Sequence, residues 1–164
     1  MHIHSGIAAG VARRQSGVGL IEVLIAVLVL AIGVLGIAAL QAKSLRNSQS
    51  ALERSQAVVQ TYSILEAMRA NAVEARAGGY TMAMACKAPP PRRASSNAAR
   101  LAGNDQAFWI GGLQAALGEE ACGTITCAPV AGGGTTDCTV TVRWDDSRGS
   151  GGSEGQEVTT VVRI

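Results

Sequence analysis

The side chains that most often carry chemistry are few in this sequence, and they fall into two groups. The two histidines, His2 and His4, both lie at the N-terminal end. The four cysteines all lie in the second half of the chain: Cys86, Cys122, Cys127 and Cys138. An even number of cysteines is typical of a disulfide framework, whereas a zinc site usually brings CxxC pairs or histidines. We therefore expect two disulfides and no metal site, provided that the cysteines face an oxidising compartment.

No arrangement of residues in the sequence indicates catalysis. The chain has no phosphate-binding GxxxxGK[ST] motif and no GxGxxG motif after a predicted strand. The adjacent acids Glu119-Glu120 and Asp145-Asp146 fit solvated turns. A formal net charge of +2 over 164 residues argues against a strongly basic nucleic-acid-binding surface. We expect a protein that is not an enzyme, has no cofactor and has no nucleic-acid partner.

The apolar residues are concentrated in one segment, Val18 to Leu40, in which Glu22 is the single charged residue. As a helix rising about 1.5 Å per residue, this segment would span roughly 35 Å, enough to cross a hydrocarbon core of about 30 Å. A secretory signal would have a shorter apolar region of about 7–15 residues and a small-residue cleavage site. We expect a single membrane span with the short N-terminus in the cytoplasm and the cysteines outside it.

Glu22 stands near the start of this apolar segment. A carboxylate costs about 2.5–3.5 kcal/mol at the centre of a membrane helix and less near an end. Its position fits a side chain that reaches the interface beside a favourable helix N-terminus. It fits equally a buried partner for a positive group, and the spacing does not decide between the two.

After the span, the sequence predicts an amphipathic helix that continues to Gly78-Gly79, a helix-stop signal. Its apolar positions recur at spacings of three, four or seven: Leu45, Leu52, Val59, Tyr62, Leu65, Met68 and Ala72. A proline-rich loop follows at 89–91, with a basic cluster that fits a solvated loop better than a DNA-binding surface: Lys87, Arg92, Arg93 and Arg100. A short helix over 105–117 is expected to bury Phe108, Trp109 and Leu113.

The residues from Gly123 onward predict a three-stranded antiparallel meander, because three segments rich in Val and Thr alternate between apolar and polar positions: 124–127, 138–144 and 157–164. Pairing Trp144 with Val158 and Val140 with Val162 places the apolar faces of the last two strands on the core side. A shift of one residue would split them between the two sides of the sheet.

The cysteine pairing stays open in the sequence, because four cysteines allow three connectivities. If the first hairpin is centred on its glycines at 132–134, Cys127 and Cys138 face each other. Cys86 would then pair with Cys122.

The segment Gly17-Val18-Gly19-Leu20-Ile21-Glu22, followed by an unbroken apolar helix, resembles the class III signal of type IV prepilins and type II secretion pseudopilins. The resemblance implies that a prepilin peptidase cuts after Gly17 and that the new N-terminus, Val18, is methylated. It also implies that Glu22 is the assembly carboxylate. The sequence departs from the common pattern, since Val18 and Gly19 stand where Phe and Thr are usual. The helix has no proline, although Gly33 and Gly36 offer a softer hinge or a close helix contact.

Later segments resemble the PilV subgroup of minor pilins: 38–42, 46–51, 54–57, 68–71, 79–80, 108–109 and 142–148. The resemblance implies an α+β type IV pilin fold, with a long N-terminal helix, membrane-spanning in its first half, packed on a small antiparallel sheet. The expected divisions are a leader peptide (1–17), the membrane and filament-core half of the helix (18–40), its amphipathic half (41–77), a loop with a short helix (78–122) and the disulfide-bonded meander (123–164).

The function that the resemblance implies is that of a minor pilin which primes type IV pilus assembly. Its expected partners are the prepilin peptidase, other minor pilins, the major pilin and a pilus-tip adhesin. It would lie in the inner membrane with its C-terminal domain in the periplasm, and then in the pilus at the cell surface. Two alternatives are a minor pseudopilin of a type II secretion system and, from another class, a membrane-anchored periplasmic binding domain.

Overall fold

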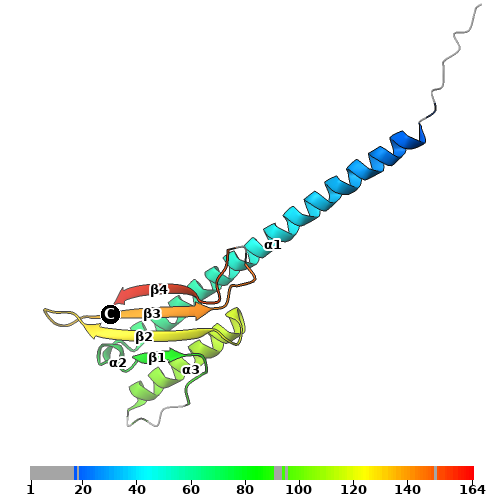
Figure 1. The fold of residues 1–164 in the computed structure, drawn as a ribbon. Coiled ribbons are helices and arrows are strands. Elements are labelled where there is room, and N and C mark those ends of the chain that lie inside the picture. The colour runs from blue at the N-terminus through cyan, green and yellow to red at the C-terminus, as the bar shows by residue number, and fades with distance from the viewer. Residues whose placement is uncertain (1–16, 18, 91–93, 95, 150) are drawn as a thin grey trace, which may run out of the picture. The chain divides into compact units, whose positions relative to one another are not determined.

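The computed structural model describes residues 17, 19–90, 94, 96–149 and 151–164. The elements, in chain order (Figure 1), are α1 (Leu20–Ala70), α2 (Ala72–Arg76), β1 (Met82–Ala85), α3 (Asn97–Leu117), β2 (Cys122–Pro129), β3 (Thr136–Trp144) and β4 (Gln156–Arg163). Two compact units meet within α1, after Gln41, and each is described by itself.

The first unit consists, in its described part, of the N-terminal portion of α1. Helix α1 begins at Leu20, two residues after the expected start, and every residue from there to Gln41 is exposed. This part of the helix has no polar face, and no other described segment of the unit covers its apolar side chains. Gly33 and Gly36 lie inside this continuous helix.

The second unit is an α+β head in which the rest of α1, together with α3, packs on one face of a four-stranded antiparallel sheet. The strand order is β1-β2-β3-β4. One buried cluster contains side chains from both helices and from the core-facing positions of the sheet, among them Ile64, Trp109, Ile125, Val140 and Trp144. The expected α+β class is confirmed.

The sheet has one strand more than the sequence predicted. The additional strand, β1, pairs with β2 at the edge of the sheet, with Met82 opposite Ile125. Its sequence, MAMA, contains no β-branched or aromatic residue, and such residues are the usual signal of a strand. The strand forms because β2 offers it an unpaired edge.

The register of the last hairpin differs from the prediction by two residues. Trp144 lies opposite Gln156, and Val140 lies opposite Thr160. Side chains alternate between the two faces of a strand, so a shift of two residues returns each one to the same face. Cys138, Val140, Val142 and Trp144 are all buried, as predicted.

Helix α3 begins eight residues before the expected start. The side chain of Ser96 accepts a hydrogen bond from the Ala99 amide at 3.1 Å and thus caps the helix. Trp109 and Leu113 are buried as expected, but the prediction was wrong for Phe108, which is 79% exposed. Neighbouring residues point about 100° apart on a helix, so the two adjacent aromatic rings cannot both face the core.

The core-facing side of α1 matches the sequence prediction only at Leu65 and Met68. Leu45, Leu52, Val59 and Tyr62, which were predicted as apolar positions of the amphipathic helix, are 55–71% exposed. The buried positions of α1 are instead Ala57, Thr61, Ile64, Leu65 and Met68. The small side chains of Ala57 and Thr61 let α1 pack closely against the core. The buried Thr61 hydroxyl donates a hydrogen bond to the Ala57 carbonyl at 2.8 Å.

The helical region also breaks before the predicted stop. Helix α1 ends at Ala70, and the short α2 follows Asn71. The Asn71 side-chain amide donates a hydrogen bond to the Ala98 carbonyl at 2.9 Å, and this bond connects the break between α1 and α2 to α3. Gly78 then takes a positive φ of 81°, which suits glycine and ends the helical segment.

Candidate membrane and assembly site

The residues that could direct processing and assembly surround the start of α1. Gly17 is exposed, while Val18 and the rest of the predicted leader, 1–16, lie outside the described residues. The Gly19 carbonyl accepts the first helical bonds, from the Glu22 amide at 2.9 Å and the Val23 amide at 3.3 Å. Glu22 therefore stands in the first turn, where free backbone N–H groups favour a carboxylate.

The Glu22 side chain is exposed, and it forms no hydrogen bond or ion pair with any residue that the structure describes. One turn further, the small side chain of Ala26 leaves a shallow hollow between Glu22, Val27 and Leu30. The carboxylate is thus open to a positive group from outside the described chain, with an apolar surface beside it.

The helix that carries Glu22 is long and apolar enough to cross a membrane. Its most apolar window of 18 residues has a mean hydropathy of 3.1, and no part of that window is buried. The exposed large side chains between Leu20 and Leu40 form a continuous apolar surface, which water solvates poorly. This surface suggests membrane anchoring through the N-terminal part of α1.

Comparison with known families identifies the same segment. Residues 12–38 carry the prokaryotic N-terminal methylation motif. This motif is the signal of type IV pilins and pseudopilins, and it includes Gly17, Val18 and Glu22. It supports a pilin-type protein, and the α+β architecture is consistent with the type IV pilin fold. The motif also implies interaction with a prepilin peptidase and with other pilins. Searches of the curated proteins and of the solved structures each found no match.

The four cysteines of the head form two disulfides. Cys127 and Cys138 lie directly opposite each other on β2 and β3, with sulfurs 2.09 Å apart. Cys86 and Cys122 are joined at 2.02 Å. This is the pairing that follows from a hairpin centred on the glycines at 132–134.

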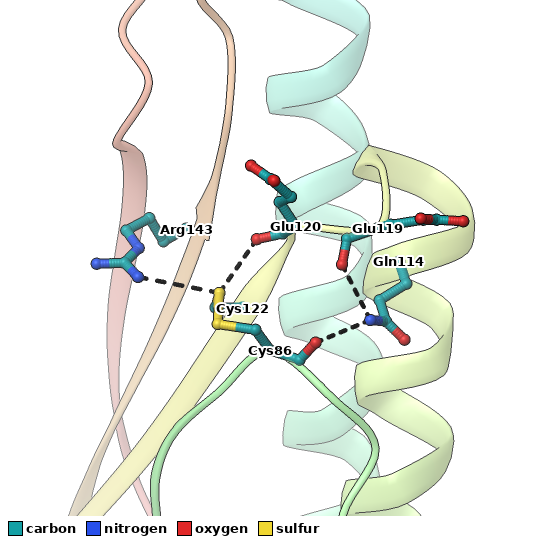
Figure 2. Close-up of a disulfide and its surroundings, with 6 residues drawn as sticks. All are labelled: Cys86, Gln114, Glu119, Glu120, Cys122 and Arg143. Carbon is teal, nitrogen blue, oxygen red and sulfur yellow. Dashed lines mark hydrogen bonds between the residues drawn. A yellow bond between two sulfur atoms is a disulfide. The ribbon is translucent and has the colours of Figure 1, made fainter.

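The Cys86–Cys122 disulfide joins the residue that follows β1 to the first residue of β2 (Figure 2). The side-chain amide of Gln114, on α3, donates to the Cys86 carbonyl at 2.9 Å and to the Glu119 carbonyl at 3.1 Å. Arg143, on β3, places Nη2 3.9 Å from the Cys122 sulfur. The edge strand β1 is thereby held to the sheet and to the end of α3.

Tyr80 connects the segment after α2 to α3, a contact that the spacing of residues in the sequence did not reveal. Its hydroxyl donates to Asp105 Oδ2 at 2.5 Å, and its carbonyl accepts from the Gln106 side chain at 2.7 Å. Burial raises the pKa of Tyr80 above its ordinary value, and the hydrogen bond to Asp105 raises this pKa further. The protonated Tyr80 hydroxyl therefore connects the segment after α2 to α3.

The acidic pair at the β3–β4 turn is only half solvated, contrary to the prediction. Asp145 is exposed and accepts from the Ser147 amide at 2.8 Å, a bond that lowers the pKa of Asp145. Asp146 is 3% exposed, and its Oδ2 accepts from the Ser50 hydroxyl at 2.5 Å. Asp146 thus attaches the turn to α1.

Within the described part of the chain, no group of three or more His, Cys, Asp or Glu side chains is placed to hold a metal ion.

Proposed function

We propose that this protein is a minor pilin of the PilV type, which acts in type IV pilus assembly after cleavage behind Gly17 and methylation of Val18. The observation that carries the proposal is the methylation motif at 12–38, because it includes the start of α1 and most of its exposed apolar part. That helix continues into a disulfide-bonded α+β head. A membrane or a bundle of similar helices is needed to cover the first part, whereas the head covers one face of the second.

Glu22 would act as the assembly carboxylate. Cleavage behind Gly17 creates a positive α-amine on Val18, and the neighbouring subunit's amine is a natural partner for the unpaired Glu22 carboxylate. In a helix bundle of low dielectric constant, a lone carboxylate is penalised, and a matched ion pair removes this penalty. This ion pair would therefore favour the arrangement of two subunits in which the Val18 amine of one contacts the Glu22 carboxylate of the other.

The inner membrane would hold the precursor, with the head in the periplasm, where the two disulfides can form. The prepilin peptidase would act on its cytoplasmic side. Other minor pilins and the major pilin would be the partners in assembly, and a tip adhesin a further one. The resemblance of the segments 46–51 and 142–148 to PilV favours this role.

A minor pseudopilin of type II secretion remains the second candidate, because the methylation motif is shared by both systems. Deletion of the protein in its own cell separates them. We expect loss of surface pili, restored by the intact chain, with secreted proteins unchanged. Loss of exoprotein secretion with normal pili would instead assign the chain to the secretion system. If neither changed, a membrane-anchored periplasmic binding domain would be favoured.

A further inference from the structure

Strand β4 lies at one edge of the sheet, with β3 on one side and no strand of the described chain on the other (Figure 1). Its pairing with β3 is regular over its whole length, and its sequence, QEVTTVVR, contains neither proline nor glycine. Natural proteins often protect a sheet edge with a proline, a bulge or a very short strand. None of these devices is present in β4, so its edge is free to accept a further strand.

The backbone groups of β4 that face outward follow from its ladder with β3. Thr136 and Ile164 exchange two hydrogen bonds, each 2.9 Å long. Hydrogen-bonded pairs alternate with non-hydrogen-bonded pairs along an antiparallel ladder, so the even-numbered residues of β4 direct their N–H and C=O groups toward β3. The outward groups therefore belong to the odd-numbered residues, whose side chains are all exposed: Glu157, Thr159, Val161 and Arg163.

The charges of β4 are complementary to themselves in the antiparallel direction. When Thr160 of one copy lies opposite Thr160 of another, Glu157 of each copy lies opposite Arg163 of the other. In this register the outward groups at 157, 159, 161 and 163 all meet outward groups of the second copy, and each pair can exchange two hydrogen bonds. A shift of two residues in either direction separates Glu157 from Arg163. The charges therefore select one register.

The same register extends a row of alternating charges across the joined sheets. Within one copy, Arg163 Nε lies 2.7 Å from Asp137 Oδ1, and Arg143 lies opposite Glu157 in the ladder. Pairing would place the second copy's Glu157 on the free side of Arg163. Each charged side chain of β4 would then lie between two side chains of opposite charge, which stabilises cross-strand pairing.

The apolar residues of β4 fit the same register. Val158 and Val162 are half-buried at the border of the core. Pairing places Val158 of each copy opposite Val162 of the other, at a non-hydrogen-bonded position, where side chains on neighbouring strands lie closest. Both valines would therefore lose further exposed surface.

We propose that β4 pairs in the antiparallel direction with β4 of a second copy of this chain, about a two-fold axis at Thr160. The interface is isologous, because each copy contributes the same strand. The two four-stranded sheets then form one continuous sheet with β4 and its copy at the centre, and the unpaired edge of β4 is removed.

This pairing differs from any parallel packing of helix α1. The axis is perpendicular to the sheet, so it reverses every direction that lies in the plane of the sheet. The part of α1 that belongs to the head packs on one face of the sheet, so this part runs in opposite directions in the two copies. The proposal therefore joins heads that meet from opposite directions, and it requires neither cleavage behind Gly17 nor a filament.

The test uses the full chain, purified in detergent with its native disulfides intact. Thr160→Cys places a thiol on the axis, where the β-carbons of the two copies would lie about 4.5–5.5 Å apart. We expect mild oxidation to give a covalent dimer, and mass spectrometry of the non-reduced digest to show two identical peptides joined at position 160. Thr126→Cys is the control, because Thr126 is more exposed but lies on β2, away from the edge, and this variant should stay a monomer.

Charge reversal tests the register. Glu157→Arg or Arg163→Glu, added to the Thr160→Cys chain, brings like charges together at both ends of the paired strands, and each should lower the dimer yield about tenfold. An equimolar mixture of these two variants restores opposite charges at both ends. We expect the dimer to return in the mixture and to link one variant to the other. Both residues are exposed, so neither substitution alters the core.

Four results would overturn the proposal. They are a Thr160→Cys chain that stays a monomer, a Thr126→Cys chain that dimerises equally, charge variants that dimerise as well as the parent, and a mixture that does not recover the dimer. A covalent product that contains another protein in place of the second copy would also contradict it. Since the purified chain forms no pilus, none of these results bears on the proposed function.

Discussion

Glu22 is the residue on which the proposed assembly mechanism depends. It is exposed in the first turn of α1, and its side chain has no partner among the described residues. We predict that Glu22→Ala leaves cleavage behind Gly17 intact but strongly reduces incorporation into surface fibres. Glu22→Gln, which keeps the shape and removes the charge, should behave in the same way. Immunoblots of the sheared fibres against the membrane fraction measure the effect, and normal incorporation of Glu22→Ala would refute the assembly role.

Tyr80 is the residue whose loss should most weaken the junction between α2 and α3. We predict that Tyr80→Phe lowers the free energy of unfolding by about 1–3 kcal/mol, because it removes a buried hydrogen bond to a carboxylate. Chemical unfolding of the detergent-solubilised chain measures this change. Tyr62→Phe is the matched control, since Tyr62 is 56% exposed, and it should have little effect. Equal losses in the two variants would contradict the role of Tyr80.

The same tyrosine gives the stability a dependence on alkaline pH. Folding raises the pKa of Tyr80, so the folded chain keeps its proton where the unfolded chain loses it. Its contribution is complete below the ordinary tyrosine pKa of about 10 and is lost progressively as the pH rises above that value. Unfolding measured between neutral and strongly alkaline pH should show a steeper alkaline loss for the native chain than for Tyr80→Phe. Parallel curves would show that Tyr80 is not responsible.

At the scale of elements, the two disulfides should differ in their contribution. The chain-entropy model assigns about 3 kcal/mol to Cys127–Cys138, which closes a separation of 11 residues, and about 4 kcal/mol to Cys86–Cys122, which closes 36. Replacing each pair with serine should therefore destabilise the head in that order. Thermal unfolding of the two variants measures the difference, and an inverted order would show that local packing outweighs the entropy of the loop.

The packing of α3 on β2 depends on a glycine. A β-carbon at Gly123 would overlap the Trp109 ring, whereas one at Gly111 would meet open space. Gly123→Ala should cost about 1–3 kcal/mol by overpacking. Gly111→Ala should instead stabilise the exposed helix, by up to about 1 kcal/mol. Chemical unfolding distinguishes them, and a neutral Gly123→Ala would contradict the close approach of the tryptophan ring.

Elements with strong local signals could be predicted from the sequence. The alternation in β3, the glycines at 132–134 and the long apolar helix are fixed by chain-local chemistry, and the fold class was implied by the resemblance to type IV pilins. Strand β1 could not be found, because MAMA forms a strand only through the edge of β2. The core face of α1 could not be chosen, because the helix has two apolar faces and only the head decides between them. Asp146 appeared solvated because its partner, Ser50, lies 96 residues away.

For the whole molecule, the excess positive charge lies in the proposed leader, and the apolar residues are concentrated in the helix segment that follows it. The proposed leader holds Arg13 and Arg14 and no acid, so cleavage takes the basic count from 14 to 14 − 2 = 12, against 12 acids. The mature side chains would be formally neutral, and both histidines would be lost. The N-terminal part of α1 would then face only membrane or neighbouring subunits, while the head carries the disulfides and all five aromatic residues.

Processing behind Gly17 is the claim on which the pilin account depends, and the mass of the mature N-terminal peptide tests it most directly. The protein is isolated from its own membrane and fibres, digested and analysed by mass spectrometry. The account predicts an N-terminal peptide that begins at Val18 and carries one added methyl group. A chain that retains Met1, or one cut near Ala39 as a secretory signal would be, would contradict it.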